Sequence, residues 1–378
     1  MEKKVFTALG LMTGTSVDGV DVSLIKSDGF SEFVPILDKY YEFDEELRDK
    51  IIQLRDNISS INDLKKYSES LKTIERELTL FHAEIINGVF DKYDDKIDLI
   101  GFHGQTIFHN SAKKVSLQLG DGKLLSQLTQ KLVINDFRKN DLENGGQGAP
   151  LVPIFHKLIS IFINKKFGIN FPLNIINIGG ITNVTHIPDD KIYENDKLKA
   201  HDIGPGNCMI DEWIRKNSDK KFDERGDIAK SGKVNDLILN QAIENFSNFS
   251  YINSLDVKEF DVSFAKGLSL EDGCATITKF TAYLIAEGLK KTDNIQETNF
   301  LCGGGRKNYF LIENIKNFLF NEKFQIKNID DYKLDGDFIE SQAFAYLAIR
   351  SFLNLPISFP STTKCKLPIS GGIINKNF

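Results

Sequence analysis

Short segments of alternating apolar and polar residues, joined by glycine turns, open the sequence. Residues 4–12 and 17–26 follow this pattern on either side of the turn Thr13–Ser16, which predicts a hairpin of two strands, and Glu32–Leu37 adds a third strand. Apolar residues then recur at steps of three and four over about 45–92, which predicts a long helical region. The chain therefore begins as α/β proteins do.

A second group of short apolar segments follows the helical region. KIDLIGFHG predicts a strand that ends at His103, and VSLQLG and KLVINDF predict two further strands around a helix at about 122–131. The polar, glycine-rich segment RKNDLENGGQGAPLVP comes next. Because boundaries between lobes have this composition, we place the crossing from the first lobe to the second near residue 136.

The second half of the chain repeats the pattern of the first. PLNIINIGGITNVTHI again places a glycine turn between two apolar segments, and NFLCGGG predicts a later strand. Helices are expected near 207–217, 233–246, 271–291, 306–320 and 337–354. The repetition indicates an internal duplication around a central cleft. We therefore predict an α/β protein of two lobes, the first formed by 1–135 with about 355–378 and the second by 136–354.

Composition narrows the class of protein. The 378 residues exceed the length of one core, and the net charge of −6 argues against a nucleic-acid or anionic-membrane surface. No apolar run approaches the about 20 residues that span a bilayer, and MEKKVFTALGLM lacks the apolar region of a signal peptide. The four cysteines show no paired spacing. We therefore expect a cytoplasmic protein with no disulfide framework and no nucleic-acid or membrane partner.

The two glycine turns are candidate phosphate-binding loops. Backbone N–H groups in a glycine-containing turn can converge on an anion, because glycine lets the chain approach closely. Hydroxyl groups of Thr13, Thr15 and Ser16 add donors around Gly14, and Gly179-Gly180 would act from the opposite lobe. Either turn alone is more often a structural hairpin. Their repetition favours binding of a polyphosphate.

Two carboxylates follow the first glycine turn directly. Asp18 and Asp21 are placed to bind the Mg²⁺ that accompanies a polyphosphate, either directly or through water. They are the candidate metal ligands of the sequence.

A third glycine turn, LCGGGRKN at 301–308, closes a strand and opens a helix. Its glycines form either a plain loop at the start of the helix or a flat space for a nucleobase and ribose. The chain contains no GxxxxGK[ST] segment and no GxGxxG segment after a strand. These absences exclude a P-loop protein and a dinucleotide-binding site of the usual kind.

Asp202 is the candidate general base. It precedes Gly204-Pro205-Gly206, a rigid turn between the end of a strand and the start of a helix. Asn207 is expected to cap that helix, which leaves Asp202 without a capping role. A carboxylate that takes a proton from water or from a sugar hydroxyl contributes about 10²–10⁴-fold in rate. The alternative is a turn carboxylate that binds nearby backbone N–H groups.

Four polar residues are candidates for substrate binding. His103 and Gln105 lie at a strand end, although His103 is equally consistent with a core histidine. Arg138 either forms an ion pair with Asp136 or grips a substrate carboxylate with its fork of N–H groups. Glu340 lies on the last long helix, where the alternative is a solvent-facing position.

Several of these segments occur together, in the same order, in a known family. They are GLMTGTSVDGVD, GFHGQT, NDFRKNDLENGGQGAPLVP, NIGGITNVT, HDIGPGNCMIDEW, LCGGGRKN and IESQAFAYLA. In this order the chain resembles the anhydro-N-acetylmuramic acid kinase family of the sugar kinase, heat-shock ATPase and actin superfamily. The resemblance spans about residues 9 to 350. It implies two duplicated ribonuclease H-like lobes with a nucleotide-binding cleft between them.

The resemblance also implies an activity. The family opens 1,6-anhydro-N-acetylmuramic acid, a product of peptidoglycan turnover, with water and phosphorylates O6, which gives N-acetylmuramic acid 6-phosphate and ADP. The implied cofactors are ATP and Mg²⁺, the partner is this small anhydro-amino-sugar, and we expect a homodimer. One alternative is an ordinary sugar kinase of the same superfamily that does not hydrolyse the bridge. Another is an actin-like or chaperone-like ATPase.

The resemblance assigns roles to individual residues by their place in the motifs. Asp202 matches the catalytic aspartate that deprotonates the water attacking C1. The positions that match substrate-binding residues are His103, Gln105, Arg138 and Glu340. The positions that match ATP-binding residues are Gly14, Thr15, Ser16, Val17, Asp18, Gly19, Val20, Asp21, Gly179, Gly180, Gly303, Gly304 and Gly305.

The chain departs from the family pattern at three places. Ile203 stands where the family usually has threonine, and His201 stands where an aromatic residue is common. The C-terminal STTKCK does not keep the family's usual Thr-Gly-Ala. The absence of a hydroxyl at Ile203 is expected to change contacts to substrate or water. The change at STTKCK is expected to alter what the C-terminal tail contributes to the site.

Overall fold

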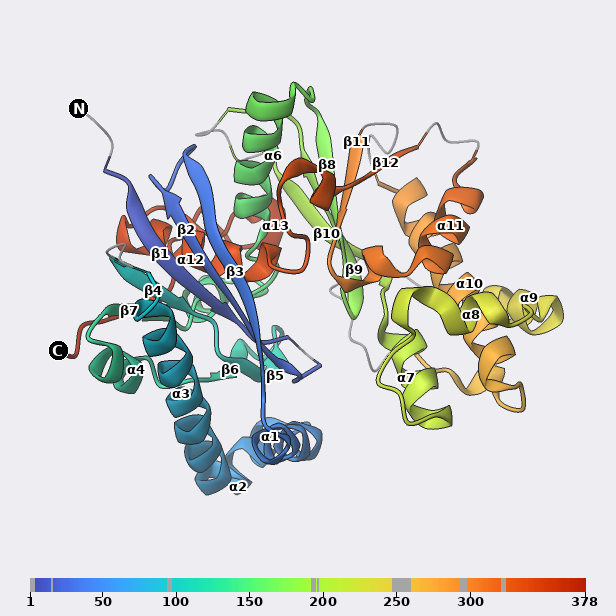
Figure 1. Ribbon diagram of the computed structural model, residues 1–378, viewed down its shortest axis with the longest axis horizontal. Helices are drawn as coiled ribbons and strands as arrows, with labels where there is room; N and C mark the ends of the chain where they lie inside the picture. Colours follow the sequence, from blue (N-terminus) through green and yellow to red (C-terminus); the bar gives the residue numbers. More distant parts are fainter. Residues whose placement is uncertain are drawn as a thin grey trace. The chain divides into compact units, whose positions relative to one another are not determined.

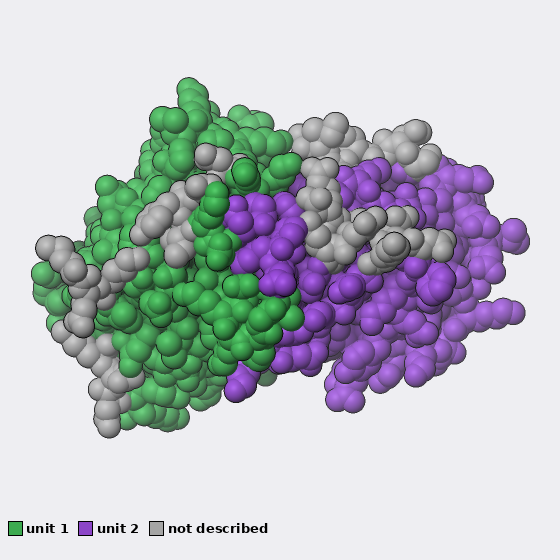
Figure 2. All heavy atoms as spheres, turned by 90° about the horizontal axis from the view of Figure 1, so that it is seen from above, with its two compact units in different colours: residues 1–169, 190–199, 338–378 green, residues 170–189, 200–337 purple. Residues whose placement is uncertain are grey.

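The computed structural model describes residues 4–14, 16–93, 97–191, 195, 197–246, 260–292, 298–320 and 324–378. Thr15 therefore lies outside the described residues. The chain divides into two units, shown in different colours in Figure 2. Unit 1 contains residues 1–169, 190–199 and 338–378, and unit 2 contains residues 170–189 and 200–337.

Unit 1 is built on a six-stranded sheet with the order β13-β7-β4-β1-β2-β3 (Figure 1). Its strands are β1 (Phe6–Met12), β2 (Gly19–Ser27), β3 (Phe33–Glu42), β4 (Leu99–Phe102), β7 (Leu132–Asn135) and β13 (Ile373–Asn375). β2 is antiparallel to β1 and β3, whereas β4 is parallel to β1 and to β7. A separate two-stranded sheet consists of β5 (Gln105–Asn110) and β6 (Val115–Leu119).

Unit 2 is built on a five-stranded sheet with the order β10-β9-β8-β11-β12. Its strands are β8 (Leu173–Ile178), β9 (Ile181–Ile187), β10 (Lys199–Pro205), β11 (Thr298–Cys302) and β12 (Gln325–Asn328). β8 is antiparallel to β9 and parallel to β11, and β11 is parallel to β12. The five strands repeat the order of β3-β2-β1-β4-β7 in unit 1, and β9, β8, β11 and β12 repeat the directions of β2, β1, β4 and β7. The strand pattern confirms the predicted duplication and the α/β class.

The helices lie between and after the strands in both units. In unit 1 they are α1 (Glu45–Asn57), α2 (Ile61–Lys66), α3 (Ser68–Phe90), α4 (Gly122–Thr129), α5 (Lys139–Glu143), α6 (Pro153–Phe167), α12 (Ile339–Phe352) and α13 (Pro360–Thr363). In unit 2 they are α7 (Cys208–Asn217), α8 (Asp227–Ser231), α9 (Asp236–Phe246), α10 (Leu270–Lys290) and α11 (Tyr309–Phe318), with 3₁₀ turns η1 (Glu224–Gly226), η3 (Ser263–Ala265), η4 (Gly304–Lys307) and η6 (Ile329–Tyr332). Among the described residues, none of these helices combines the length and the apolarity needed to cross a membrane.

The sheet of unit 1 is covered on both faces, because successive residues of a strand point to opposite sides. Leu9 shares a buried core with Ile86 of α3. Gly10 instead meets α12, where a Cβ on Gly10 would lie 1.9 Å from the backbone oxygen of Ser341. Gly101 of β4 meets α12 in the same way. Only glycine allows this close approach of a helix to the strands.

The units differ from the lobes expected from the sequence, in part because of the contact with α12. Residues 136–169, 190–199 and 338–354 were expected in the second lobe, but they belong to unit 1. α12 belongs there because it packs on β1, β2 and β4. Residues 355–378 do join unit 1, where β13 pairs with β7 as an edge strand.

The predicted helical region at 45–92 is three helices. Ser60 begins α2 with a reciprocal capping box to Asp63, and the chain breaks again at Tyr67 before α3. The signal for the first break is present in the sequence as Ser60-x-x-Asp63, since a capping box marks a helix start.

Candidate active site

The turn between β1 and β2, the predicted first phosphate loop, holds its backbone in an unusual conformation. The N–H of Val17 donates to the carbonyl oxygen of Gly14 at 3.3 Å, and Val17 has a φ of 58°. β-branched residues rarely adopt this left-handed conformation, so the surroundings must hold it. The Val17 side chain is fully buried, which provides that hold. A Cβ at Gly14 would meet nothing nearer than the Ser16 Oγ at 3.8 Å, so a ligand can approach this glycine.

The side chains of this loop divide by burial. Val17 and Val20 are fully buried and belong to the core of unit 1, so only their backbone is available to a nucleotide. Ser16 is exposed. A Cβ at Gly19 would lie 2.2 Å from the backbone oxygen of Tyr41, so this glycine is required by packing.

Asp18 and Asp21, the predicted metal ligands, lie among other charged groups. Asp18 Oδ1 is 3.5 Å from Arg48 Nε, and Asp21 is opposite Tyr40 on β3. Burial, then the negative charges of Asp18, Glu42 and Asp21, raise the pKa of Tyr40 to about 12. Among the described residues, no group of three or more His, Cys, Asp or Glu side chains is arranged to hold a metal ion. Mg²⁺ on a nucleotide commonly takes only one or two carboxylates with phosphates and water, so this pair fits it.

The first phosphate loop is bonded to the turn that follows β4. The Thr13 hydroxyl donates to the carbonyl oxygen of Gly104 at 2.7 Å, and Gln105 Nε2 donates to the carbonyl oxygen of Gly14 at 3.3 Å. Both side chains are buried. Gln105, predicted to bind substrate, therefore also holds the phosphate loop. Its buried Oε1 has no hydrogen-bond partner within the part of the chain that the structure describes.

His103, which is buried, and Arg138, which is half-buried, form a hydrogen-bonded pair. Arg138 Nη2 lies 3.0 Å from His103 Nε2, and His103 Nδ1 lies 2.7 Å from the carbonyl oxygen of Gly104. Because arginine only donates, Nε2 must accept and Nδ1 must carry the proton. Burial first, and the charge of Arg138 second, lower the pKa of His103 to about 3. The histidine is therefore neutral at ordinary pH, and the charge of the pair resides on the arginine.

Arg138 retains a donor that could bind a ligand. Its Nη1 donates to the carbonyl oxygen of Gly148 at 2.9 Å. Its Nε is buried and has no hydrogen-bond partner among the described residues. Burial lowers the pKa of Arg138, whereas the charges of Glu340 and Asp141 raise it. An acceptor oxygen from a ligand would remove the cost of the unpaired N–H, and a carboxylate is the strongest acceptor of this kind.

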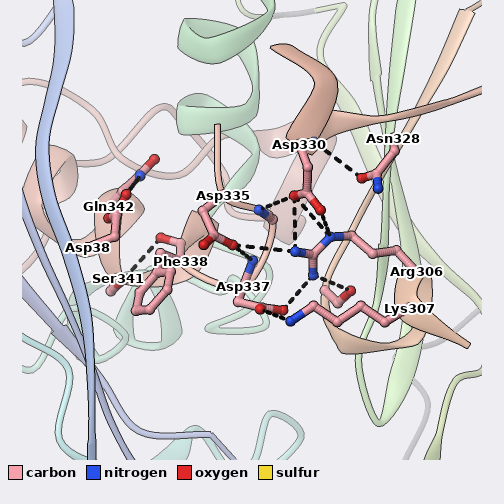
Figure 3. A network of polar contacts seen from close by, with 12 residues as sticks. Asp38, Arg306, Lys307, Asn328, Asp330, Asp335, Asp337, Phe338, Ser341 and Gln342 are labelled. Carbon is pink, nitrogen blue, oxygen red and sulfur yellow. Dashed lines mark hydrogen bonds and ion pairs between the residues drawn. The ribbon is translucent and has the colours of Figure 1, made fainter. Parts of the chain in front are cut away.

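Glu340 lies in the first turn of α12, and its neighbours anchor that turn to the sheet. Ser341 Oγ lies 2.7 Å from Ser23 Oγ. Gln342 Nε2 donates to the two carboxylate oxygens of Asp38 at 3.0 and 2.9 Å (Figure 3). Ser341 and Gln342 are fully buried. Glu340 itself is half-buried, so its burial alone does not separate the substrate-binding position from the solvent-facing one.

In unit 2, the second glycine turn is bonded to the start of α7. The N–H groups of Gly206 and Asn207 donate to the carbonyl oxygens of Gly180 and Gly179 at 2.8 and 2.7 Å. These bonds satisfy backbone donors at the helix start. Asn207 is the residue before the helix, as predicted, but its side chain makes no capping hydrogen bond. A Cβ at Gly179 would meet no atom nearer than 3.6 Å, so a ligand can approach there.

Asp202, the predicted base, lies on β10 and is half-buried. The next residue, Ile203, is fully buried and packs against α10, where a Cβ at Gly288 would lie 1.9 Å from the Ile203 carbonyl oxygen. Neighbouring side chains of a strand point to opposite faces. The Ile203 side chain therefore points away from the face that carries Asp202. The departure from threonine therefore places an apolar side chain in the core of unit 2.

The glycines of the third turn have different functions. A Cβ at Gly303 would lie 2.3 Å from Asn177 Oδ1, and a Cβ at Gly305 would lie 2.2 Å from the Ile178 side chain. These two glycines are required by packing against the end of β8. A Cβ at Gly304 would meet only Asn207 Nδ2, at 3.8 Å. Gly304 is therefore the member of the turn that a ligand can approach.

Arg306, a residue that was not predicted from the sequence, holds the third turn in place. Its side chain is 2% exposed, and it donates to the Gly303 carbonyl oxygen at 3.0 Å and to Asp330, Asp335 and Asp337 (Figure 3). Burial opposes the charge of Arg306, but its hydrogen bonds to Asp337 and Asp330 and their negative charges raise the pKa of Arg306. The same contacts lower the pKa of Asp337, against the effect of burial. The clustered aspartates of NIDDYKLDGD were the sequence feature that could have predicted a buried arginine partner.

The predicted residues thus gather into groups within each unit. In unit 1, His103 and Arg138 are bonded to each other, Glu340 acts on Arg138 electrostatically, and Gln105 is bonded to the first phosphate loop. In unit 2, Asn207 connects the second and third glycine turns. This connection is a feature that the sequence did not predict.

Comparison with known proteins gives a match over nearly the whole chain. The family model described as anhydro-N-acetylmuramic acid kinase matches residues 6–377. A protein named anhydro-N-acetylmuramic acid kinase from Pelagibacter ubique is 50% identical over 100% of both chains. Proteins of the same name from Agrobacterium fabrum and Brucella canis are 35% and 34% identical, over 98% and 97% of this chain and 99% and 97% of theirs.

Proposed function

The chain belongs to the anhydro-N-acetylmuramic acid kinase family, and from that premise we propose that it uses ATP to open and phosphorylate 1,6-anhydro-N-acetylmuramic acid. The products are N-acetylmuramic acid 6-phosphate and ADP, which serve peptidoglycan recycling and amino-sugar catabolism. The observation that carries the proposal is the match of residues 6–377, with 50% identity to a named relative over its full length.

In the proposed reaction, Asp202 is the general base. It takes a proton from a water molecule that attacks C1, and the C1–O6 bond of the bridge breaks. O6 is then free to accept the γ-phosphoryl group. A base of this kind supplies about 10²–10⁴-fold in rate, so positioning and charge neutralisation must supply the remainder of the acceleration.

Glycine turns from the two units are proposed to bind the nucleotide. Gly14 and Gly179, at which a Cβ would meet no close atom, support binding of phosphates by the first two turns. Gly304 supports binding of the adenosine, and Arg306 holds that turn in place. Mg²⁺ would neutralise charge on the transferred phosphoryl group, and Asp18 and Asp21 would hold it directly or through water.

The sugar is proposed to bind at His103, Gln105, Arg138 and Glu340. The lactyl carboxylate is the natural partner of Arg138, because the guanidinium is charged and its buried Nε lacks an acceptor among the described residues. The neutral His103 holds the arginine without adding charge. We further propose a homodimeric, cytoplasmic enzyme.

The alternatives differ in how ADP release depends on the sugar. An assay with purified protein and ATP compares 1,6-anhydro-N-acetylmuramic acid, N-acetylmuramic acid and no sugar. The proposal predicts ADP release only with the anhydro sugar, together with a product whose mass includes one added water and one phosphate group. Equal release without sugar would indicate an actin-like or chaperone-like ATPase. A phosphorylated product without the added water would indicate an ordinary sugar kinase.

A further inference from the structure

The C-terminal segment around α13 is bonded to the loop that carries the predicted sugar-binding arginine. The Thr363 hydroxyl donates to Asp141 Oδ1 at 2.6 Å, and the Thr363 carbonyl oxygen accepts the Gln147 N–H at 2.7 Å. Thr363 and Asp141 are 0% and 1% exposed. A hydrogen bond from a buried hydroxyl to a buried carboxylate is strong, and losing one partner leaves the other unsatisfied. The segment STTKCK therefore makes a defined contact in unit 1.

The second oxygen of Asp141 continues the contact toward Arg138. Asp141 Oδ2 accepts the N–H of Gly148 at 2.7 Å, and the carbonyl oxygen of Gly148 accepts Arg138 Nη1 at 2.9 Å. A Cβ at Gly146 would lie 2.1 Å from the same Asp141 oxygen, so the loop closes tightly on this carboxylate. Thr363, Asp141, Gly148 and Arg138 thus form one continuous chain of hydrogen bonds.

The chain of hydrogen bonds continues to the first phosphate loop. Arg138 Nη2 donates to His103, His103 donates to the Gly104 carbonyl oxygen, and Thr13 donates to the same oxygen. Every side chain along this path apart from Arg138 is buried. The orientation of the Arg138 guanidinium depends on two acceptors, the Gly148 carbonyl oxygen for Nη1 and His103 Nε2 for Nη2. A displacement of the Gly148 carbonyl would therefore reorient the guanidinium.

We propose that Thr363 is a positioning residue, which acts through Asp141 and Gly148 to hold the Arg138 guanidinium in the orientation that binds the carboxylate of the sugar. The inference rests on the proposed function, because it needs an anionic sugar at Arg138. It gives the C-terminal tail a specific role in recognition of that sugar, although the tail departs from the usual family pattern. The charge of Asp141 also acts on Arg138, raising its pKa against the effect of burial.

The test replaces the Thr363 hydroxyl while keeping the side-chain shape. Thr363→Val removes the donor to Asp141, Thr363→Ser restores it, and Thr362→Val is the matched control. Thr362 is also buried, but its hydroxyl bonds only within its own turn, to Phe359, among the contacts of the described residues. Each full-length variant is assayed for the KM of the anhydro sugar and the KM of ATP, and its unfolding is followed.

The proposal predicts that Thr363→Val raises the KM of the sugar about tenfold, as expected when a charge-assisted contact is misplaced. The KM of ATP should stay within about twofold, and Thr363→Ser and Thr362→Val should resemble the wild type. Equal rises in both KM values, an unchanged sugar KM, or the same effect in Thr362→Val would overturn the role of Thr363. If Thr363→Val does not fold, Asp141→Asn, which keeps the size and removes the charge, must show the selective rise.

The wild-type protein separates this inference from the proposed function. If the wild type does not turn over the anhydro sugar, the proposed function fails and this inference fails with it. If the wild type is active and Thr363→Val shows no selective effect, only the inference fails.

Discussion

At the scale of single residues, burial determines which groups of the site carry charge. His103 lies inside unit 1 and accepts from Arg138, so its pKa falls to about 3 and the imidazole is neutral. Arg138 keeps its charge because guanidinium is a very weak acid. The pair therefore presents one positive charge with an unpaired N–H among the described residues. This arrangement suits an anion such as a sugar carboxylate.

Replacing Arg138 by alanine should weaken binding of the sugar selectively. Loss of a hydrogen bond between charged groups predicts a rise of about 10- to 100-fold in the KM for the lactyl-bearing sugar, with the KM of ATP unchanged. Lys139→Ala is the control, since this neighbouring lysine is exposed. An unchanged sugar KM in Arg138→Ala would remove Arg138 from carboxylate binding.

Asp202→Asn should abolish turnover while leaving ATP affinity nearly intact. The amide keeps the size of the side chain but cannot accept the proton, so we expect a loss of at least about 10²–10⁴-fold in kcat. Steady-state kinetics and nucleotide binding on the same preparation measure both quantities, with the exposed Asp219→Asn as control. A variant that retains more than a few per cent of turnover would place the base elsewhere.

At the scale of elements, the glycine turns illustrate what the sequence could and could not predict. The repeated strand, glycine turn and strand were visible because the pattern is local. The distinct functions of Gly303, Gly304 and Gly305 were not, since they depend on β8, which is distant in sequence. The orientation of Ile203 was predictable in principle, because strand residues alternate between faces.

Alanine substitutions should separate the packing glycines from the open one. Gly305→Ala places a methyl group against Ile178, so we expect a loss of about 1–3 kcal/mol of stability. Gly304→Ala meets no close atom and should leave stability within about 0.5 kcal/mol, but it should raise the KM of ATP. Thermal unfolding and ATP kinetics of both variants check this. Equal stability of the two variants would contradict the packing, and an unchanged KM of ATP in Gly304→Ala would contradict its place in the nucleotide site.

Two helices show why local patterns were insufficient. α6 was not predicted because it is buried on nearly all sides, so its sequence lacks the one-sided periodicity that reveals a helix. α12 was predicted, but its unit was not, since its partners β1 and β4 are more than two hundred residues away. Gly10 and Gly101, glycines inside buried strands, were the available signals of a close helix.

At the scale of the whole molecule, the duplication was predicted correctly and the lobe boundaries were not. The order of five strands and the direction of four of them repeat in the two units. The repeated strand, glycine turn and strand in the second half of the sequence predicted this duplication. The division of the chain depends on long-range packing of α12 and β13, which no local segment reveals. The contact of Thr363 was missed for the same reason, because its partner Asp141 lies in a distant segment of the chain.

The protein should lose stability in mild acid. Burial lowers the pKa of His82 to about 4 and those of His103 and His156 to about 3. Histidines in the unfolded chain keep their ordinary pKa of about 6.5. Below that pH the unfolded chain therefore binds more protons than the folded chain. Each such group contributes stability that is present above about pH 6.5 and falls by about 1.4 kcal/mol per pH unit toward its folded pKa. Urea unfolding should show a lower midpoint at pH 5 than at pH 7. An equal or higher midpoint at pH 5 would contradict the buried neutral state.

The central claim is that water opens the anhydro bridge while ATP phosphorylates O6. Its most direct test is a short reaction in oxygen-18 water, followed by mass spectrometry of the sugar phosphate, with unlabelled product kept in the same water to measure exchange. The account predicts one oxygen-18 atom at C1 and none in the phosphate group. A phosphorylated product that keeps its anhydro ring and carries no label would contradict it.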